Sequence, residues 1–151
     1  MKPEEYYNSF RKKYDLPDFA VVNLIFGLDD VENPNLGKIA ERMAEKFGKY
    51  REILESFLSA DGGDLAAVME VKNFDDKDHA AISDLFKKCI IAERSLLCLD
   101  IVGKEEDFAP LIKDLYSAWN GLREDLSRIL TKARDSWSQD TKITDELGYL
   151  G

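Results

Sequence analysis

Two acidic side chains are the residues whose positions most suggest chemistry. Glu93 and Asp100 lie seven residues, or two helical turns, apart within the apolar stretch 90–102. With successive residues placed 100° apart, both fall near the centre of the apolar stripe of that stretch rather than at its edge. A bare buried carboxylate is very costly, so each must be paired, protonated or hydrated. The sequence therefore predicts a buried polar cluster.

Arg123 is the cation that fits this cluster best. The short turn at Gly103 predicts that the helices on either side of it are antiparallel neighbours, so that residues at similar distances from the turn lie close together. Glu93 matches Arg123 better than Asp100 does, and we predict a Glu93–Arg123 ion pair. Two other interpretations stay open: a polar pocket for a ligand or metal, or a curved helix or oligomer contact that turns the acids elsewhere.

His79 is the only histidine in the chain. One histidine cannot supply the two Glu-x-x-His pairs of a di-iron bundle, and it argues against a serine or cysteine triad. Neither a Gly-rich phosphate motif nor a calcium loop is present. We expect His79 on the surface or at a helix cap, and we predict no catalytic residue, no metal ligand and no cofactor.

One pair of acidic motifs gives an alternative function. Glu52 and Glu55 are followed by Glu70 and Asn73. This spacing in part resembles that of the all-α nucleotide pyrophosphohydrolases, in which Glu-x-x-Glu and Glu-x-x-Asp pairs hold Mg²⁺, although here the second pair ends in asparagine. The resemblance implies a Mg-dependent all-α phosphohydrolase, and a ligand-binding bundle that uses inward-facing carboxylates belongs to the same alternative.

The composition limits the class of protein and its partners. A chain of 151 residues, 44% hydrophobic and 34% charged, is typical of one soluble globular domain that buries roughly 70% of its unfolded surface. The 30 acidic against 21 basic residues give a net charge of −9, which repels phosphate backbones and anionic membranes. With no apolar run near the ~18 residues of a membrane span and no signal peptide, we expect a cytoplasmic protein without nucleic-acid or membrane partners.

Three long helical stripes define the expected fold. Residues 78–103 form a helix that is apolar on two faces, which is typical of a helix surrounded by others. Regular stripes of period 3.6 predict two more long helices, over 34–60 and 107–137. We predict an all-α antiparallel helical bundle of three long helices plus two or three short helices. Residues 1–138 form this single domain, and residues 139–151 form a C-terminal tail.

The shorter segments are less clear from their pattern. Residues 3–14 are expected to form a short helix. The apolar runs 19–28 and 67–74 fit either helices or strands, and we predict helices because an isolated two-stranded ribbon is marginally stable. Asn33 and Pro34 are expected as the cap and first residue of the helix over 34–60.

A second apolar face of the helix over 78–103 indicates an interface. Ile91, Cys98 and Val102 lie opposite the main stripe. The segment 19–28 of the same chain could cover them, or two copies could bring their faces together around a two-fold axis. Since no catalytic arrangement is evident, we favour a non-enzymatic interaction or structural protein that forms a homodimer or binds another protein.

The tail is polar apart from a few apolar side chains. We expect it to be solvated, with the alternative that these side chains dock in a groove of the bundle. They are Ile143, Leu147, Tyr149 and Leu150.

Overall fold

The computed structural model describes residues 1–60 and 64–139 of the chain. Of these, 81% are helical and none lies in a strand, which confirms the all-α prediction and the choice of helix for both ambiguous apolar runs. The elements in chain order are α1 (Pro3–Tyr14), α2 (Phe19–Phe26), α3 (Leu36–Leu58), α4 (Leu65–Val71), α5 (Asp76–Val102), the 3-10 turn η2 (Glu105–Asp107) and α6 (Phe108–Ser136).

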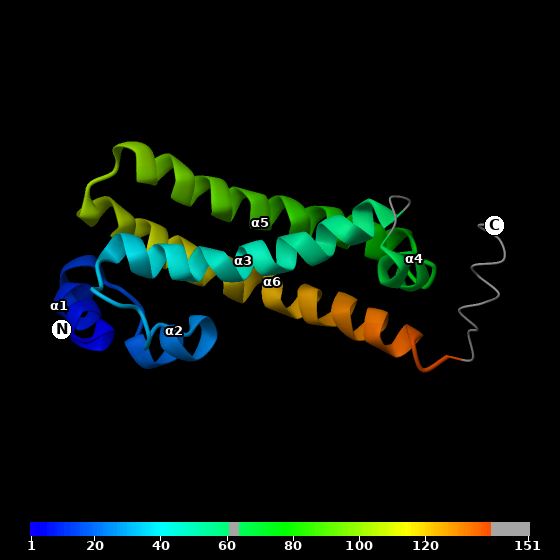
Figure 1. Ribbon diagram of the computed structural model, residues 1–151, viewed down its shortest axis with the longest axis horizontal. Coiled ribbons are helices and arrows are strands. Elements are labelled where there is room, and N and C mark those ends of the chain that lie inside the picture. The colour runs from blue at the N-terminus through cyan, green and yellow to red at the C-terminus, as the bar shows by residue number, and fades with distance from the viewer. Residues whose placement is uncertain (61–63, 140–151) are drawn as a thin grey trace.

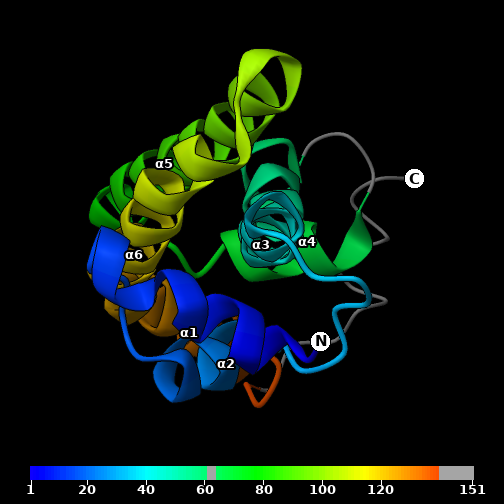
Figure 2. The same cartoon turned by 90° about the vertical axis from the view of Figure 1, so that its left-hand side faces the viewer.

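The three longest helices, α3, α5 and α6, extend along the long axis of the molecule (Figure 1). The turn from α5 to α6 lies at the end where α1 is found, and α4 lies at the other end. Viewed along that axis, α1 and α2 lie on the opposite side of the molecule from the last turns of α5 (Figure 2). The two sides therefore offer separate surfaces.

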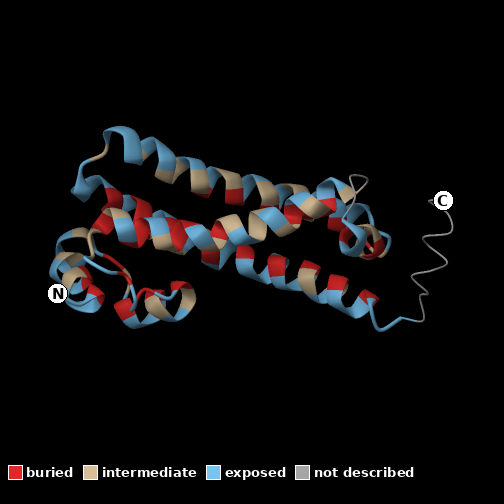
Figure 3. Cartoon of the chain, in the orientation of Figure 1, coloured by how far each residue is buried: buried red, intermediate tan, exposed pale blue. Residues whose placement is uncertain are grey.

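The central element is α3, because it packs against α2, α4, α5 and α6. The expectation that the helix over 78–103 is surrounded by others is wrong. All buried residues of α5 lie in its first part, the last of them being Ala92. Residues 93–102 are half-buried or exposed, as the blue and tan end of this helix in Figure 3 shows.

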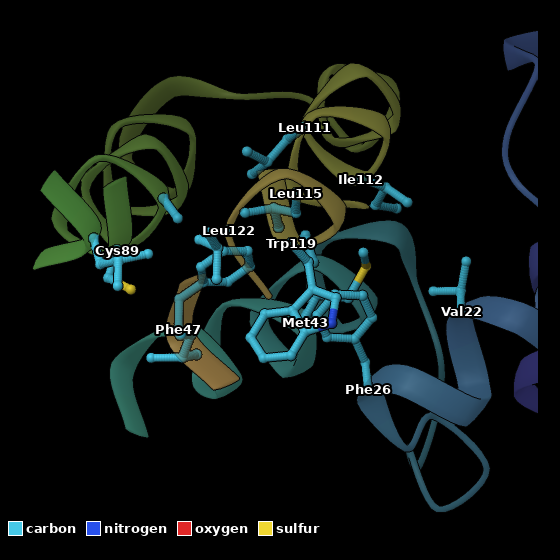
Figure 4. Close-up of a cluster of buried hydrophobic side chains, with 14 of the residues drawn as sticks. Val22, Phe26, Met43, Phe47, Cys89, Leu111, Ile112, Leu115, Trp119 and Leu122 are labelled. Atoms are coloured by element: carbon cyan, nitrogen blue, oxygen red, sulfur yellow. The ribbon is translucent and has the colours of Figure 1, made fainter. Parts of the chain in front are cut away.

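An aromatic cluster fixes α2 against the long helices. The indole of Trp119 in α6 lies 6.2 Å from the ring of Phe26 and 5.9 Å from that of Phe47, between centroids (Figure 4). Lys46 of α3 places its Nζ 4.4 Å from the Trp119 ring centre and donates a hydrogen bond of 2.7 Å to the carbonyl of Ile25. The packing of Phe26 and the hydrogen bond to the end carbonyl of Ile25 therefore stabilise the last turn of α2.

The predicted cap of α3 is wrong by two residues. The side chain of Asn35, not Asn33, accepts the capping hydrogen bond, from the backbone nitrogen of Lys38 at 2.8 Å. Asn33 instead takes a left-handed conformation with φ of 46°, which asparagine tolerates better than most residues. Pro34 thus belongs to the preceding loop, and α3 begins at Leu36.

Candidate functional site

Glu93 forms an ion pair with α3 rather than with α6. Its Oε2 atom accepts a hydrogen bond of 2.6 Å from Nε of Arg51, and the two side chains are 20% and 23% exposed. This hydrogen bond is the main cause that raises the pKa of the Arg51 guanidinium. Arg123 lies exposed on α6. The predicted Glu93–Arg123 pair is therefore wrong.

A glycine lets the Glu93 carboxylate lie against α3. A Cβ atom at Gly48 would stand 3.0 Å from Oε1 of Glu93, which is tight for a carbon contact in a packed interior. The sequence carried a signal for this approach, since a glycine inside a helix costs about 1 kcal/mol relative to alanine and often has a packing reason. Gly48 and Arg51 are the residues that sequence reasoning missed here.

Asp100 is separated from Glu93. It is exposed and lines a hollow of about 360 Å³ near the start of α3, together with Asn35 and Glu105. Glu93 lines another hollow between α3 and α5, of about 210 Å³. The predicted buried cluster of Glu93, Asp100 and Arg123 is therefore corrected: only Glu93 is partly buried, and the structure brings neither of the other two to it.

The acidic motifs of the phosphohydrolase alternative face a cation. Glu52 and Glu55 are exposed on α3, with carboxylate oxygens 3.9 and 2.9 Å from guanidinium nitrogens of Arg51. Glu70 lies on α4, where burial raises its carboxyl pKa. Within residues 1–60 and 64–139, no group of three or more His, Cys, Asp or Glu side chains is placed to hold a metal ion. The described part of the chain thus offers this alternative no metal-binding geometry.

Asp78 is a buried carboxylate that sequence reasoning did not place among the site residues. It is 2% exposed at the start of α5. Its Oδ1 accepts a hydrogen bond of 2.7 Å from Arg128, and its Oδ2 accepts one from Lys132, both on α6. The Lys132 bond is the largest cause that lowers the pKa of Asp78 well below its usual range, against the opposing effect of burial.

A signal for this ion pair was present in the sequence. Asp78 and Arg128 both lie 25 residues from Gly103, one before it and one after it. The rule of equal distances from a tight turn would have paired them. Arg128 and Lys132 are four residues apart, so they project from one face of α6 towards the same carboxylate. Asp78 also completes a capping box, because it accepts a hydrogen bond of 3.1 Å from the nitrogen of Asp75.

The apolar face of α5 is uncovered in the single chain. Ile91 is 64% exposed and Val102 is 82% exposed, and Cys98 between them is exposed as well. Leu97 and Ile101 on the adjoining side of the helix are also exposed. The alternative that residues 19–28 cover this face does not hold, because α2 packs on the other side of the molecule (Figure 2).

The two cysteines differ in their surroundings. Cys98 is exposed, whereas Cys89 is buried in the core. Burial is the main cause that raises the pKa of the Cys89 thiol to about 11, with a further contribution from the charge of Glu93. A thiol with such a pKa is a poor nucleophile at neutral pH, so Cys89 serves as a small apolar core residue.

Comparison with known protein families, with curated proteins and with solved structures finds no match for this chain. In the described part of the chain, no helix is both long and apolar enough to cross a membrane. The geometry of the side chains is therefore the basis for a functional proposal.

Proposed function

We propose that this protein is a non-enzymatic interaction protein that forms a homodimer through the exposed apolar face of α5. The proposal includes an antiparallel bundle in which α3, α5 and α6 are the three long helices and α1, α2 and α4 the short ones. We place the protein in a reducing compartment, the cytoplasm, because both of its cysteines are free thiols.

The observation that carries this proposal is the uncovered second half of α5. An apolar patch on the surface of a single chain often marks a contact with another protein. Here one helix holds five exposed apolar or sulfur-containing side chains within twelve residues, and no residue of α5 after Ala92 is buried. They are Ile91, Leu97, Cys98, Ile101 and Val102.

Charges beside this face favour a second copy of the same chain as its occupant. In a two-fold dimer whose symmetry axis is perpendicular to α5, the two α5 helices would run in opposite directions across this face. When Ile91 lies level with Val102 of the other copy, Lys88 falls level with Glu105, which follows the end of α5 and is exposed. Opposite charges then lie at the same level at both ends of the interface, which favours this register, although Lys88 also pairs with Asp84 and Glu105 also accepts a hydrogen bond from the nitrogen of Leu36. Such pairs also offset part of the repulsion between two chains of charge −9.

Sedimentation equilibrium over a micromolar concentration series tests the dimer. The mass should rise from 17.2 kDa towards twice that value. Ile91→Glu should return the monomer mass without loss of helical circular dichroism, because the residue is exposed in the single chain and only the dimer would bury the new charge without a partner.

Leu24 provides the matched control. It is 87% exposed on α2, on the other side of the molecule, so Leu24→Glu adds the same charge at a distant surface. This variant should leave the mass unchanged. A constant mass of 17.2 kDa for the parent protein, or equal dissociation by both variants, would contradict the proposed interface.

A further inference from the structure

A groove of about 340 Å³ runs along α6 beside α3, and none of its lining residues belongs to α5. Its α6 residues recur at intervals of three and four, so they share one face of the helix. The rings of Tyr50 and Trp119 lie 5.6 Å apart between centroids at one end, and Leu126 and Leu130 continue the apolar surface. The lining consists of Tyr50, Trp119, Arg123, Leu126, Ser127, Leu130, Thr131 and Arg134.

The polar lining of this groove is basic or neutral. None of its eight residues is acidic, although the chain has 30 acids against 21 bases. Arg134 lies at one end of the groove and Arg123 lies one helical turn from Trp119 at the other. Arg134 also pairs with the exposed Asp135 at 3.0 Å. At the aromatic end, Lys49 lies over the ring of Tyr50, 5.5 Å from its centre. An apolar segment that carries acids fits such a surface.

We propose that residues 140–151 of the same chain dock in this groove. These residues lie outside the part of the chain that the structure describes, which ends at Gln139, directly after α6. Four of them are apolar and match the aromatic and leucine side chains that line the groove. Asp145 and Glu146 lie between these apolar residues in the sequence. The apolar residues are Ile143, Leu147, Tyr149 and Leu150.

The lengths of tail and groove agree. Arg134 and Trp119, at the two ends of the groove, are fifteen residues apart on α6, which is about 22 Å at 1.5 Å per residue. An extended segment from Ile143 to Leu150 covers about 23 Å at 3.3 Å per residue. The three residues from Asp140 to Lys142 are available to reverse the direction of the chain after α6.

The positions of the charged residues in the tail and in the groove support an alignment in which the tail runs antiparallel to α6. With Ile143 beside Arg134 and Leu150 beside Trp119, Asp145 and Glu146 of the tail lie at levels of α6 between Arg123 and Arg134. Arginine side chains are long enough to reach carboxylates from either end, and such pairs are stronger where apolar groups exclude water. The docking is independent of the proposed dimer, because it uses a different surface and a segment of the same chain.

A spin label on the tail tests this docking directly. The full chain carries Ile91→Glu to keep it monomeric, Cys98→Ser to remove the exposed thiol, and Gly151→Cys as the labelling site, while the buried Cys89 stays unlabelled. We expect the label to broaden the amide resonances of the groove residues around Trp119, and to leave those of α4, at the other end of the molecule, unaffected.

Two tail variants separate apolar docking from a nonspecific effect of charge. Leu147→Asp should abolish the broadening because it removes an apolar contact. Thr144→Asp adds the same charge at a polar position, so the broadening should remain. Moderate salt should weaken it, since partly exposed ion pairs are screened.

Mixing two kinds of chain shows whether the tail in the groove belongs to the same chain or to another copy. Isotope-labelled chains without the spin label are combined with unlabelled chains that carry it, and docking within one chain predicts no broadening in the mixture. Broadening of groove resonances in the mixture would overturn the proposal. So would the absence of such broadening when the spin label and the isotopes are on the same chain, or equal broadening in the two tail variants. Since Ile91→Glu removes the α5 interface, failure of the docking and failure of the dimer are distinguishable.

Discussion

Replacing Asp78 by asparagine should remove one of the strongest electrostatic contributions to stability. The carboxylate is 2% exposed and binds both Arg128 and Lys132 of α6. Asparagine keeps the shape of the side chain and one acceptor oxygen, so the hydrogen bond from the nitrogen of Asp75 can persist. The main change is the loss of a negative charge from a site built around two cations.

The expected magnitude follows from the exposure of the partners. Breaking a buried ion pair costs about 3–5 kcal/mol when the remaining charge stays buried. The side chains of Arg128 and Lys132 are 43% and 38% exposed, so both can turn to water. We therefore expect Asp78→Asn to cost about 2–3 kcal/mol at pH 7. For a chain of this length that is a fall in melting temperature of about 4–12 °C.

The effect should depend on pH in one direction. The pKa of Asp78 is lowered in the folded protein relative to about 3.9 in an unfolded chain. The contribution of its charge to stability is therefore fully present well above pH 4, and it is lost as pH falls from there towards the folded-state pKa. The difference in unfolding free energy between the parent and Asp78→Asn should shrink from pH 5 to pH 2.

Urea denaturation at several pH values measures this difference, and Asp76→Asn is the matched control. Asp76 lies in the first turn of the same helix but is exposed, so its loss should cost only about 0.3–1 kcal/mol through the helix dipole. Equal costs for the two variants at pH 7, or a difference that does not change with pH, would refute the assigned role of Asp78.

Two further pairs of variants test other parts of the structure by urea denaturation. Arg51→Ala should cost about 1–2 kcal/mol of unfolding free energy because Glu93 loses its partner. Arg123→Ala, on the exposed face of α6, should change the unfolding free energy by less than about 0.5 kcal/mol. A larger cost for Arg123→Ala than for Arg51→Ala would support the Glu93–Arg123 pair expected from the sequence. Gly121→Ala should stabilise α6 by about 0.5–1 kcal/mol, since the added Cβ meets nothing within 4 Å. Gly27→Ala should destabilise by about 1–2 kcal/mol because φ there is +67°, and equal effects at the two glycines would contradict this reasoning.

The helices were predictable because their apolar residues recur every three or four positions. The stripe over 107–137 corresponds to α6 at Phe108–Ser136, and the predicted first helix has the bounds of α1, Pro3–Tyr14. The start of α3 was not predictable to the residue. Asparagines precede and follow Pro34, so residue type alone cannot decide which one caps the helix.

The polar site was predictable only in part. A helical wheel indicates the direction of a side chain, and it correctly turned Glu93 towards a neighbouring helix. It does not say which helix lies there, and the contact with Arg51 depends on α3 approaching α5 at Gly48. The wheel also assumes that a neighbour continues along the whole helix. This assumption fails for the second half of α5, where no residue beyond Ala92 is buried, and Asp100 is exposed there.

In the second half of α5 the apolar pattern does not predict burial within the single chain. Its apolar content predicted burial, and Ile91 and Val102 are nevertheless exposed in the single chain. Each exposed apolar Å² forfeits about 25 cal/mol of stabilisation that burial would provide, so a sequence that keeps several such residues on one helix face gives up stability in the monomer. A second chain that covers the face would recover this free energy, whereas folding within one chain does not. The disagreement between an apolar pattern and an uncovered position therefore supports α5 as the interface.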